Sequence, residues 1–144
     1  MPEDQTPIPP TIQPPPNSPA TPPPSESNAR SWNMFCHLSA LSGFVGVPLG
    51  NVLGPLIIWQ IKKNEIPSVD AHGKAALNFQ LTVLIAGLVA GGAMLVGFLF
   101  CFGLLLLPVV ILIGLAGIIF PIIAGIKANN GEDYKYPWSL ELIK

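Results

Sequence analysis

Residues 75–126 read AALNFQLTVLIAGLVAGGAMLVGFLFCFGLLLLPVVILIGLAGIIFPIIAGI and contain no Asp, Glu, Lys, Arg or His. As a single helix, these 52 residues would be roughly 78 Å long, more than twice the ~30 Å hydrocarbon core of a bilayer. An unpaired backbone amide or carbonyl costs several kcal/mol in lipid, so we expect two helices joined by a tight turn. The sequence therefore predicts an integral membrane protein built around a long transmembrane hairpin.

The overall composition supports this class. The chain has 144 residues, of which 50% are apolar and 10% charged, whereas a soluble domain has roughly 25% charged residues. Its 7 basic and 8 acidic residues form no basic patch, so nucleic acid is not an expected partner. Cys36 and Cys101 lack the spacing of metal ligands, and we expect neither a metal nor a disulfide. The lipid bilayer is the expected partner.

The first 30 residues differ from the rest. Residues 1–28 hold 11 of the 17 prolines, and such a segment cannot bury enough apolar surface to offset the entropy of ordering. Pro7–Pro10 fits a PxxP docking motif, but no Arg or Lys flanks it, which favours a linker. We expect residues 1–30 to form a disordered, Pro-rich cytoplasmic tail and residues 31–144 to form the transmembrane domain.

Two short helices are expected before the long hairpin, at about 32–45 and 51–62, separated by Gly46-Val47-Pro48-Leu49-Gly50. Each is only about 18–21 Å long, so neither crosses the bilayer comfortably alone. Two arrangements remain open. Residues 32–59 form one Pro/Gly-broken span, or the two helices form a hairpin that enters and leaves the membrane on one side.

The long hairpin is expected to consist of helices at about 68–99 and 104–129. Both of its ends are flanked by the chain's six lysines, whereas its turn carries no charge, and this places both ends in the cytoplasm. The N-terminus is then also cytoplasmic if the first two helices form a hairpin, and outside if they form one span. The predicted fold class is an all-α, four-helix membrane bundle with two short N-terminal helices.

Small residues recur at four-residue multiples in the long hairpin and are candidates for close helix packing: Gly87, Gly91, Gly117 and Gly125. Such spacing serves either packing within one chain or a homo-oligomer interface, and we favour the former.

No residue group predicts catalysis. The long spans contain no ionisable side chain, and the lone His37 beside Cys36 is typical of a structural helix histidine. Asp70 and His72 are two residues apart, which turns them to different helix faces. The polar residues at the ends of the hairpin are candidates for contact with a partner or with lipid headgroups: Lys62, Lys63, Asp70, His72, Lys74, Asn78, Asn129 and Asn130.

Four ordered motifs resemble one bacterial family of small membrane proteins, catalogued as domain of unknown function forty-eight seventy. They are His37-Leu38-Ser39-Ala40-Leu41, Gly54-Pro55-Leu56-Ile57-Ile58-Trp59 with Lys62-Lys63, residues 69–80, and residues 126–132 with Tyr136-Pro137. That family is more distantly similar to the Tic-twenty-type component of chloroplast import. The resemblance implies four helices, which favours the N-terminal hairpin and two cytoplasmic termini in the bacterial inner membrane.

We therefore expect a non-catalytic accessory or scaffold protein of the inner membrane, without enzyme activity or cofactor, that meets other membrane proteins or copies of itself. The alternative is an oligomeric transport or protein-translocation element. That function needs several copies, because four mostly apolar helices offer no polar pathway of their own.

Overall fold

The computed structural model describes residues 25–144, and the expected tail lies outside this range up to residue 24. The described elements are α1 (Glu26–Leu38), the 3-10 helix η1 (Ser39–Val45), α2 (Gly50–Lys62), α3 (Pro67–Leu99), the 3-10 helix η2 (Gly103–Leu106) and α4 (Leu107–Asn129). No strand occurs between residues 25 and 144. The all-helical class with four α-helices is confirmed.

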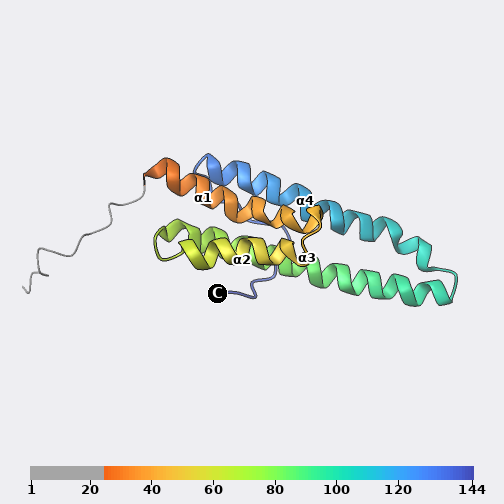
Figure 1. The fold of residues 1–144 in the computed structure, drawn as a ribbon. Coiled ribbons are helices and arrows are strands. Elements are labelled where there is room, and N and C mark those ends of the chain that lie inside the picture. Colours follow the sequence, from red (N-terminus) through yellow and green to blue (C-terminus); the bar gives the residue numbers. More distant parts are fainter. Residues whose placement is uncertain (1–24) are drawn as a thin grey trace, which may run out of the picture.

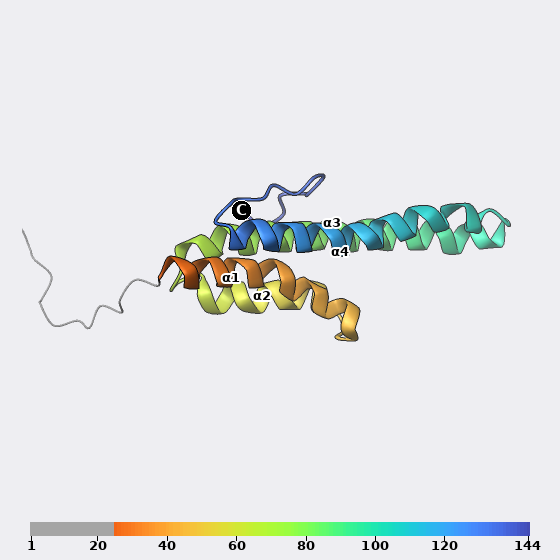
Figure 2. The same ribbon diagram turned by 90° about the horizontal axis from the view of Figure 1, so that it is seen from above.

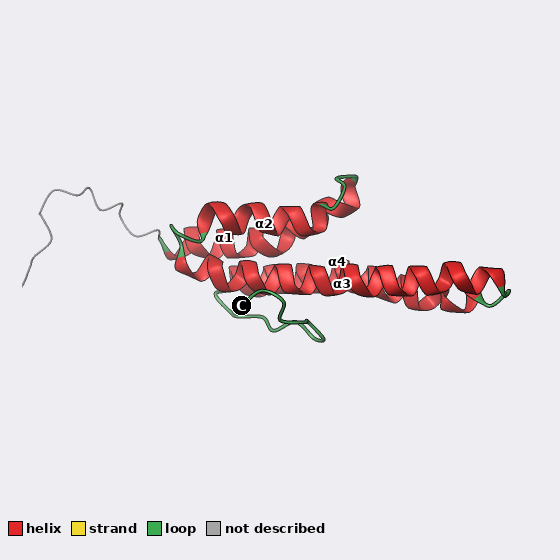
Figure 3. Ribbon diagram, turned by 90° about the horizontal axis from the view of Figure 1, so that it is seen from below, coloured by secondary structure: helices red, strands yellow, loops and turns green. Residues whose placement is uncertain are grey.

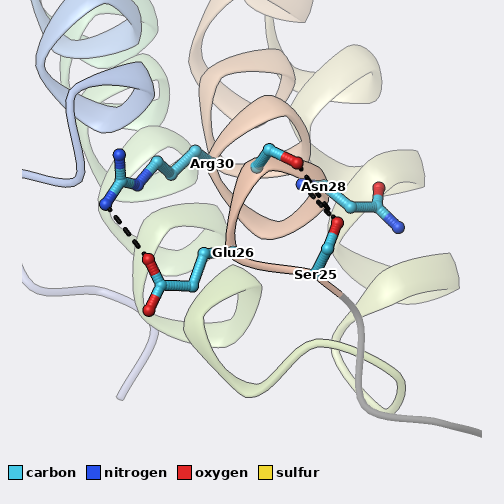
Figure 4. Close-up of polar contacts among 5 residues, drawn as sticks. Ser25, Glu26, Asn28 and Arg30 are labelled. Atoms are coloured by element: carbon cyan, nitrogen blue, oxygen red, sulfur yellow. Dashed lines mark hydrogen bonds and ion pairs between the residues drawn. The ribbon is translucent and has the colours of Figure 1, made fainter.

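Helix α1 begins earlier than the sequence suggested. The hydroxyl of Ser25 accepts a hydrogen bond from the backbone amide of Asn28 at 3.4 Å, and Arg30 pairs with Glu26 at 3.4 Å (Figure 4). A serine in this capping position is worth about 1 kcal/mol, and Glu26 lies favourably in the first turn. Residues 26–30, expected to belong to the tail, are therefore helical, and the α-helix already ends at Leu38.

The first two helices form a hairpin. Figures 1 and 2 show α1 and α2 side by side and antiparallel, joined through η1 and a turn with Gly46 at φ 92°. The two arms are very close, because a Cβ added to Gly54 would lie 2.3 Å from the carbonyl oxygen of Ser39. Of the two arrangements left open by the sequence, the structure has the hairpin.

The other two helices, α3 and α4, form the long hairpin. Both are long and apolar enough to cross a membrane, with mean hydropathies of 2.2 and 2.8 over their most apolar stretches. In those stretches 0% and 11% of the residues are buried, so the apolar side chains face outward. A core helix of a water-soluble domain would bury them, whereas a helix in lipid exposes them.

The two hairpins share one end of the molecule. The beginnings of α1 and α3 and the ends of α2 and α4 lie together, and Lys62, Lys63, Lys74 and Lys127 belong to this lysine-bearing end (Figure 1). At the opposite turn end, residues 100–106, α3 and α4 extend well beyond the shorter hairpin (Figure 2). The chain then continues after α4 as an extended C-terminal segment, residues 132–144, on the side of α3 and α4 away from α1 and α2 (Figure 3).

The four predicted packing glycines have different surroundings. A Cβ at Gly125 would lie 2.9 Å from Leu38 of α1, and one at Gly117 would lie 3.2 Å from Val83 of α3. A Cβ at Gly87 or Gly91 would meet no atom within 4 Å among the described residues. Of these four glycines, the two on α4 thus permit close contacts within the chain, and the two on α3 do not.

Gln80 is a polar residue in the packed half of α3. It is 1% exposed, and neither its amide nitrogen nor its amide oxygen has a hydrogen-bond partner among the described residues. Since a buried unpaired amide costs about 1–3 kcal/mol, Gln80→Met is expected to raise the free energy of unfolding by about 1 kcal/mol. Unfolding in detergent measures the change. The matched control is Gln60→Met on the exposed side of α2, and equal effects of both changes would contradict the prediction.

Candidate functional site

A buried hydrogen-bonded cluster joins α1, α3 and the C-terminal segment. Nδ1 of His37 lies 2.8 Å from the hydroxyl of Tyr136, and its Nε2 lies 3.1 Å from Nδ1 of His72. On the far side, Nε2 of His72 lies 3.5 Å from a carboxylate oxygen of Asp133. His37 is completely buried, whereas Asp133 is fully exposed, so the four groups lead from the core to the surface.

The donor and acceptor roles in these hydrogen bonds depend on the imidazole tautomers, and the nearby carboxylate of Asp133 favours one assignment. An ionised carboxylate only accepts, so Nε2–H of His72 points toward it and Nδ1 of His72 is left as an acceptor. His37 must then donate from Nε2 to His72, and the hydroxyl of Tyr136 donates to Nδ1 of His37. One assignment of tautomers thus satisfies both imidazoles and the phenol.

The two groups of the cluster outside the candidate spans are held neutral. Burial, reinforced by the nearby His72, lowers the pKa of His37 to about 3. Burial also raises the pKa of Tyr136 well above its ordinary value, with smaller contributions from Tyr134 and Cys36. At neutral pH the imidazole and the phenol therefore carry no charge, which makes the cluster a polar link between three segments.

The C-terminal segment is bound to α3 by Asn78. The side-chain oxygen of Asn78 accepts from the amides of Leu142 and Ile143 at 3.0 and 2.7 Å, and its nitrogen donates to the carbonyl of Ile143 at 2.9 Å. One turn further along, the hydroxyl of Thr82 accepts from the amide of Leu140 at 2.9 Å. One asparagine thus makes three hydrogen bonds to a segment more than 60 residues away.

Asp70, in the first turn of α3, contacts α2. A carboxylate oxygen of Asp70 accepts from the indole nitrogen of Trp59 at 2.8 Å, and the other pairs with Lys74 at 2.7 Å, as their four-residue spacing predicts. Lys63 lies over the Trp59 ring at 4.6 Å, and Gly73 leaves the room that this indole occupies. Asp70 therefore joins α3 to α2, whereas Lys74 pairs with Asp70 within α3.

The remaining predicted site residues lie around the same end. Lys62 pairs with Glu65 and lies 4.8 Å from the centre of the Trp32 ring. Asn129 and Asn130 end α4 and are exposed. A groove of about 420 Å³ between α3 and the C-terminal segment is lined by Lys74 and Asn78, together with Asp133, Lys135 and Glu141. The predicted residues thus gather at the lysine-bearing end. Among them Asp70 and Lys74 pair directly, His72 belongs to the buried cluster, and Asn78 binds the C-terminal segment.

The contacts of His37 with Tyr136 and His72 could not be predicted from the sequence. Tyr136 is 99 residues from His37, and His72 is 35 residues from it, so no local spacing reveals the contact. Asp133, which orients the cluster, was not a candidate either. Within residues 25–144, no group of three or more His, Cys, Asp or Glu side chains is placed to hold a metal ion.

The bonds of Asn78 can be tested directly. Asn78→Ala leaves the amides of Leu142 and Ile143 without their acceptor and is expected to release the C-terminal segment, at a local cost of about 1–3 kcal/mol. Hydrogen exchange at residues 140–143 should then become at least about tenfold faster. Asn129→Ala, at the exposed end of α4, is the control. Unchanged exchange in Asn78→Ala would show that the segment is held by other contacts.

These features define a small all-α membrane protein, with two candidate spans and a shorter helical hairpin packed on one end of them. Residues 28–143 match the MamF/MmsF model, described as the magnetosome magnetite crystal formation protein family, and the chain belongs to that family. No curated protein and no solved structure matches the chain.

The family resemblance drawn from the sequence is therefore wrong. The matching family is the magnetosome one, rather than domain of unknown function forty-eight seventy or a Tic-twenty-type family, and nothing supports an import-like transport role. The motifs that suggested it contain residues that contact other helices: His37 contacts His72, Trp59 donates to Asp70, and Lys62 lies over the Trp32 ring. Such contacts serve the fold, and a fold does not identify a function.

Proposed function

We propose that this protein is a non-catalytic component of the magnetosome membrane that contributes to magnetite crystal formation. The observation that carries the proposal is the family match over residues 28–143, which includes all of α2, α3 and α4 and most of α1. The outward-facing apolar stretches of α3 and α4 support residence in the membrane.

The distribution of charge supports a scaffold role. The turn end, residues 100–106, contains no charged residue, and the carboxylates of the described chain are at or near the lysine-bearing end. The turn end therefore brings no carboxylate to a metal ion or a mineral surface. The positive-inside rule places the lysine-bearing end, with the start of α1 and the C-terminal segment, in the cytoplasm. That end offers a groove and exposed polar residues to other membrane proteins.

The absence of a catalytic role is also part of the proposal. The histidine and the tyrosine at the centre of the cluster are neutral and hydrogen-bonded to one another, and Asp70 is paired with Lys74 and Trp59. A general base needs a pKa near the working pH and access to a substrate, and the buried His37 has neither.

The function is tested in a magnetite-forming bacterium from which the gene for this protein is deleted. Electron microscopy of the crystals is expected to show a changed size or number, and expression of the intact protein should restore the original crystals. A fluorescent fusion should co-purify with magnetosome membranes. Unchanged crystals together with a fusion that distributes evenly over the cell membrane would refute the proposal.

A further inference from the structure

The two hairpins extend to different distances from the lysine-bearing end. From the lysine-bearing end inward, the uncharged part of α2, residues 50–61, extends about 18 Å, whereas the uncharged part of α3, residues 75–99, extends about 37 Å. The turn of the shorter hairpin lies against the middle of the longer one. The ring of Phe44 lies 3.7 Å from the position that a Cβ at Gly117 would occupy. The shorter hairpin thus extends only about halfway along the longer one (Figure 2).

The turn of the shorter hairpin is suited to hydrocarbon. It exposes large apolar side chains on all sides, with Phe44 51%, Val45 81%, Val47 47% and Leu49 59% exposed. Between Arg30 and Lys62 the chain has no Asp, Glu, Lys or Arg. Burying these side chains in lipid is favourable, and no charged group opposes it. The shorter hairpin is therefore immersed in the half of the bilayer next to the lysine-bearing end.

The two halves of the bilayer consequently hold different amounts of protein. Four helices, flanked by the C-terminal segment, occupy the half next to the lysine-bearing end, and two helices occupy the other half. At about 10 Å across, each helix contributes roughly 100 Å² of cross-section, so the ratio between the halves is about two.

We propose that this protein is a wedge that selects curved membrane, with its lysine-bearing end in the convex leaflet. A convex leaflet has more area at the headgroups than its opposing leaflet, and a molecule that is wider on that side fills the excess area. The inference is independent of the role in magnetite formation, because it rests on the unequal lengths of the two hairpins and on the immersion of both in the bilayer. In a cell, a vesicle whose outer face is cytoplasmic offers this curvature to a protein with a cytoplasmic lysine-bearing end.

The test uses full-length protein in giant vesicles from which narrow membrane tethers are pulled, so that the outer leaflet of each tether is strongly convex. A membrane-impermeant maleimide dye added outside labels only molecules whose accessible cysteine faces outward, so the position of that cysteine selects which orientation is labelled. It reaches the natural Cys101 at the exposed turn end, whereas Cys36 is buried. In Asn64→Cys with Cys101→Ser, it reaches the turn between α2 and α3 at the lysine-bearing end.

Molecules of that double variant, labelled at position 64, are expected to be about twofold or more enriched on tethers relative to the flat vesicle, and molecules labelled at Cys101 to be depleted. Because the two labels mark opposite orientations of the same protein, a general preference of the protein or the dye for tethers would shift both labels in the same direction. Equal densities on tether and vesicle for both labels, or enrichment of both, would overturn the proposal.

A charge in the turn of the shorter hairpin tests whether that hairpin causes the sorting. Val47→Lys places a charge at the exposed turn of the shorter hairpin, where it favours withdrawal toward the headgroups, and sorting on tethers is expected to weaken. Ile61→Lys adds the same charge at an exposed position beside Lys62 and should leave sorting unchanged. Circular dichroism checks that both variants keep their helices. Undiminished sorting in a folded Val47→Lys would show that the shorter hairpin does not cause it.

Discussion

Gly54→Ala is expected to lower the free energy of unfolding by about 3 kcal/mol, a large loss for the addition of a single methyl group. The added Cβ would lie 2.3 Å from the carbonyl oxygen of Ser39 and 2.8 Å from its carbonyl carbon. These are backbone atoms, which cannot rotate away as a side chain would. The two arms of the shorter hairpin must therefore separate, and unfolding in detergent by increasing amounts of a denaturing surfactant measures the loss.

The matched control is Gly87→Ala, the same substitution in another helix. A Cβ at Gly87 meets nothing within 4 Å, and alanine is about 1 kcal/mol better than glycine inside a helix, so this variant should be at least as stable as the original protein. Equal losses in both variants would mean that the approach of Ser39 to Gly54 is not a tight contact.

Acid is expected to weaken the fold through His37. Its pKa is about 3 in the folded protein and about 6.5 in the unfolded chain, so the unfolded chain takes up the proton first as the pH falls. The contribution of the neutral His37 to the free energy of unfolding is then fully present above about pH 7 and is lost progressively between about pH 6.5 and pH 3. At pH 5 the loss should be about 2 kcal/mol. The groups facing His37 are His72 and Tyr136, with Asp133 beyond, and none of them supplies a negative charge in contact with it.

Thermal unfolding in detergent at pH 7.5 and pH 5 measures this loss. The variant His37→Gln should be less stable than the original protein at pH 7.5, because Tyr136 and His72 lose their partner, but its stability should depend much less on pH. An original protein that is equally stable at both values would rule out a buried neutral His37.

Local signals in the sequence predicted most of the helices. The uncharged run gave the long hairpin, because a bilayer limits the length of a span, and Pro67 marks the start of α3 as expected of a proline in the first turn. The start of α1 was missed, because the Pro-rich composition before it hides the capping role of Ser25. Composition averages over many residues, whereas a cap depends on one.

The candidate site was only partly predictable. Asp70 and Lys74 pair within one helix, and four-residue spacing reveals such pairs. The surroundings of His37 depend on Tyr136 and His72, which only the packing of three segments brings together. The resemblance to another family was wrong as well: several residues of its motifs make contacts between helices, and a shared fold does not identify a function.

The three hydrogen bonds of Asn78 also set an order of events during synthesis. Its partners Leu142 and Ile143 are added 64 and 65 residues later, which at about 5–20 residues per second takes roughly 3–13 s. For that interval the growing chain contains α3 without the segment that pairs with this amide. An unpaired amide is costly in hydrocarbon, so solvation by water is favoured for Asn78 until its partners arrive. The first turns of α3 would then stay at the membrane surface throughout translation, and the helix would reach its final depth only once residues 142 and 143 have been made.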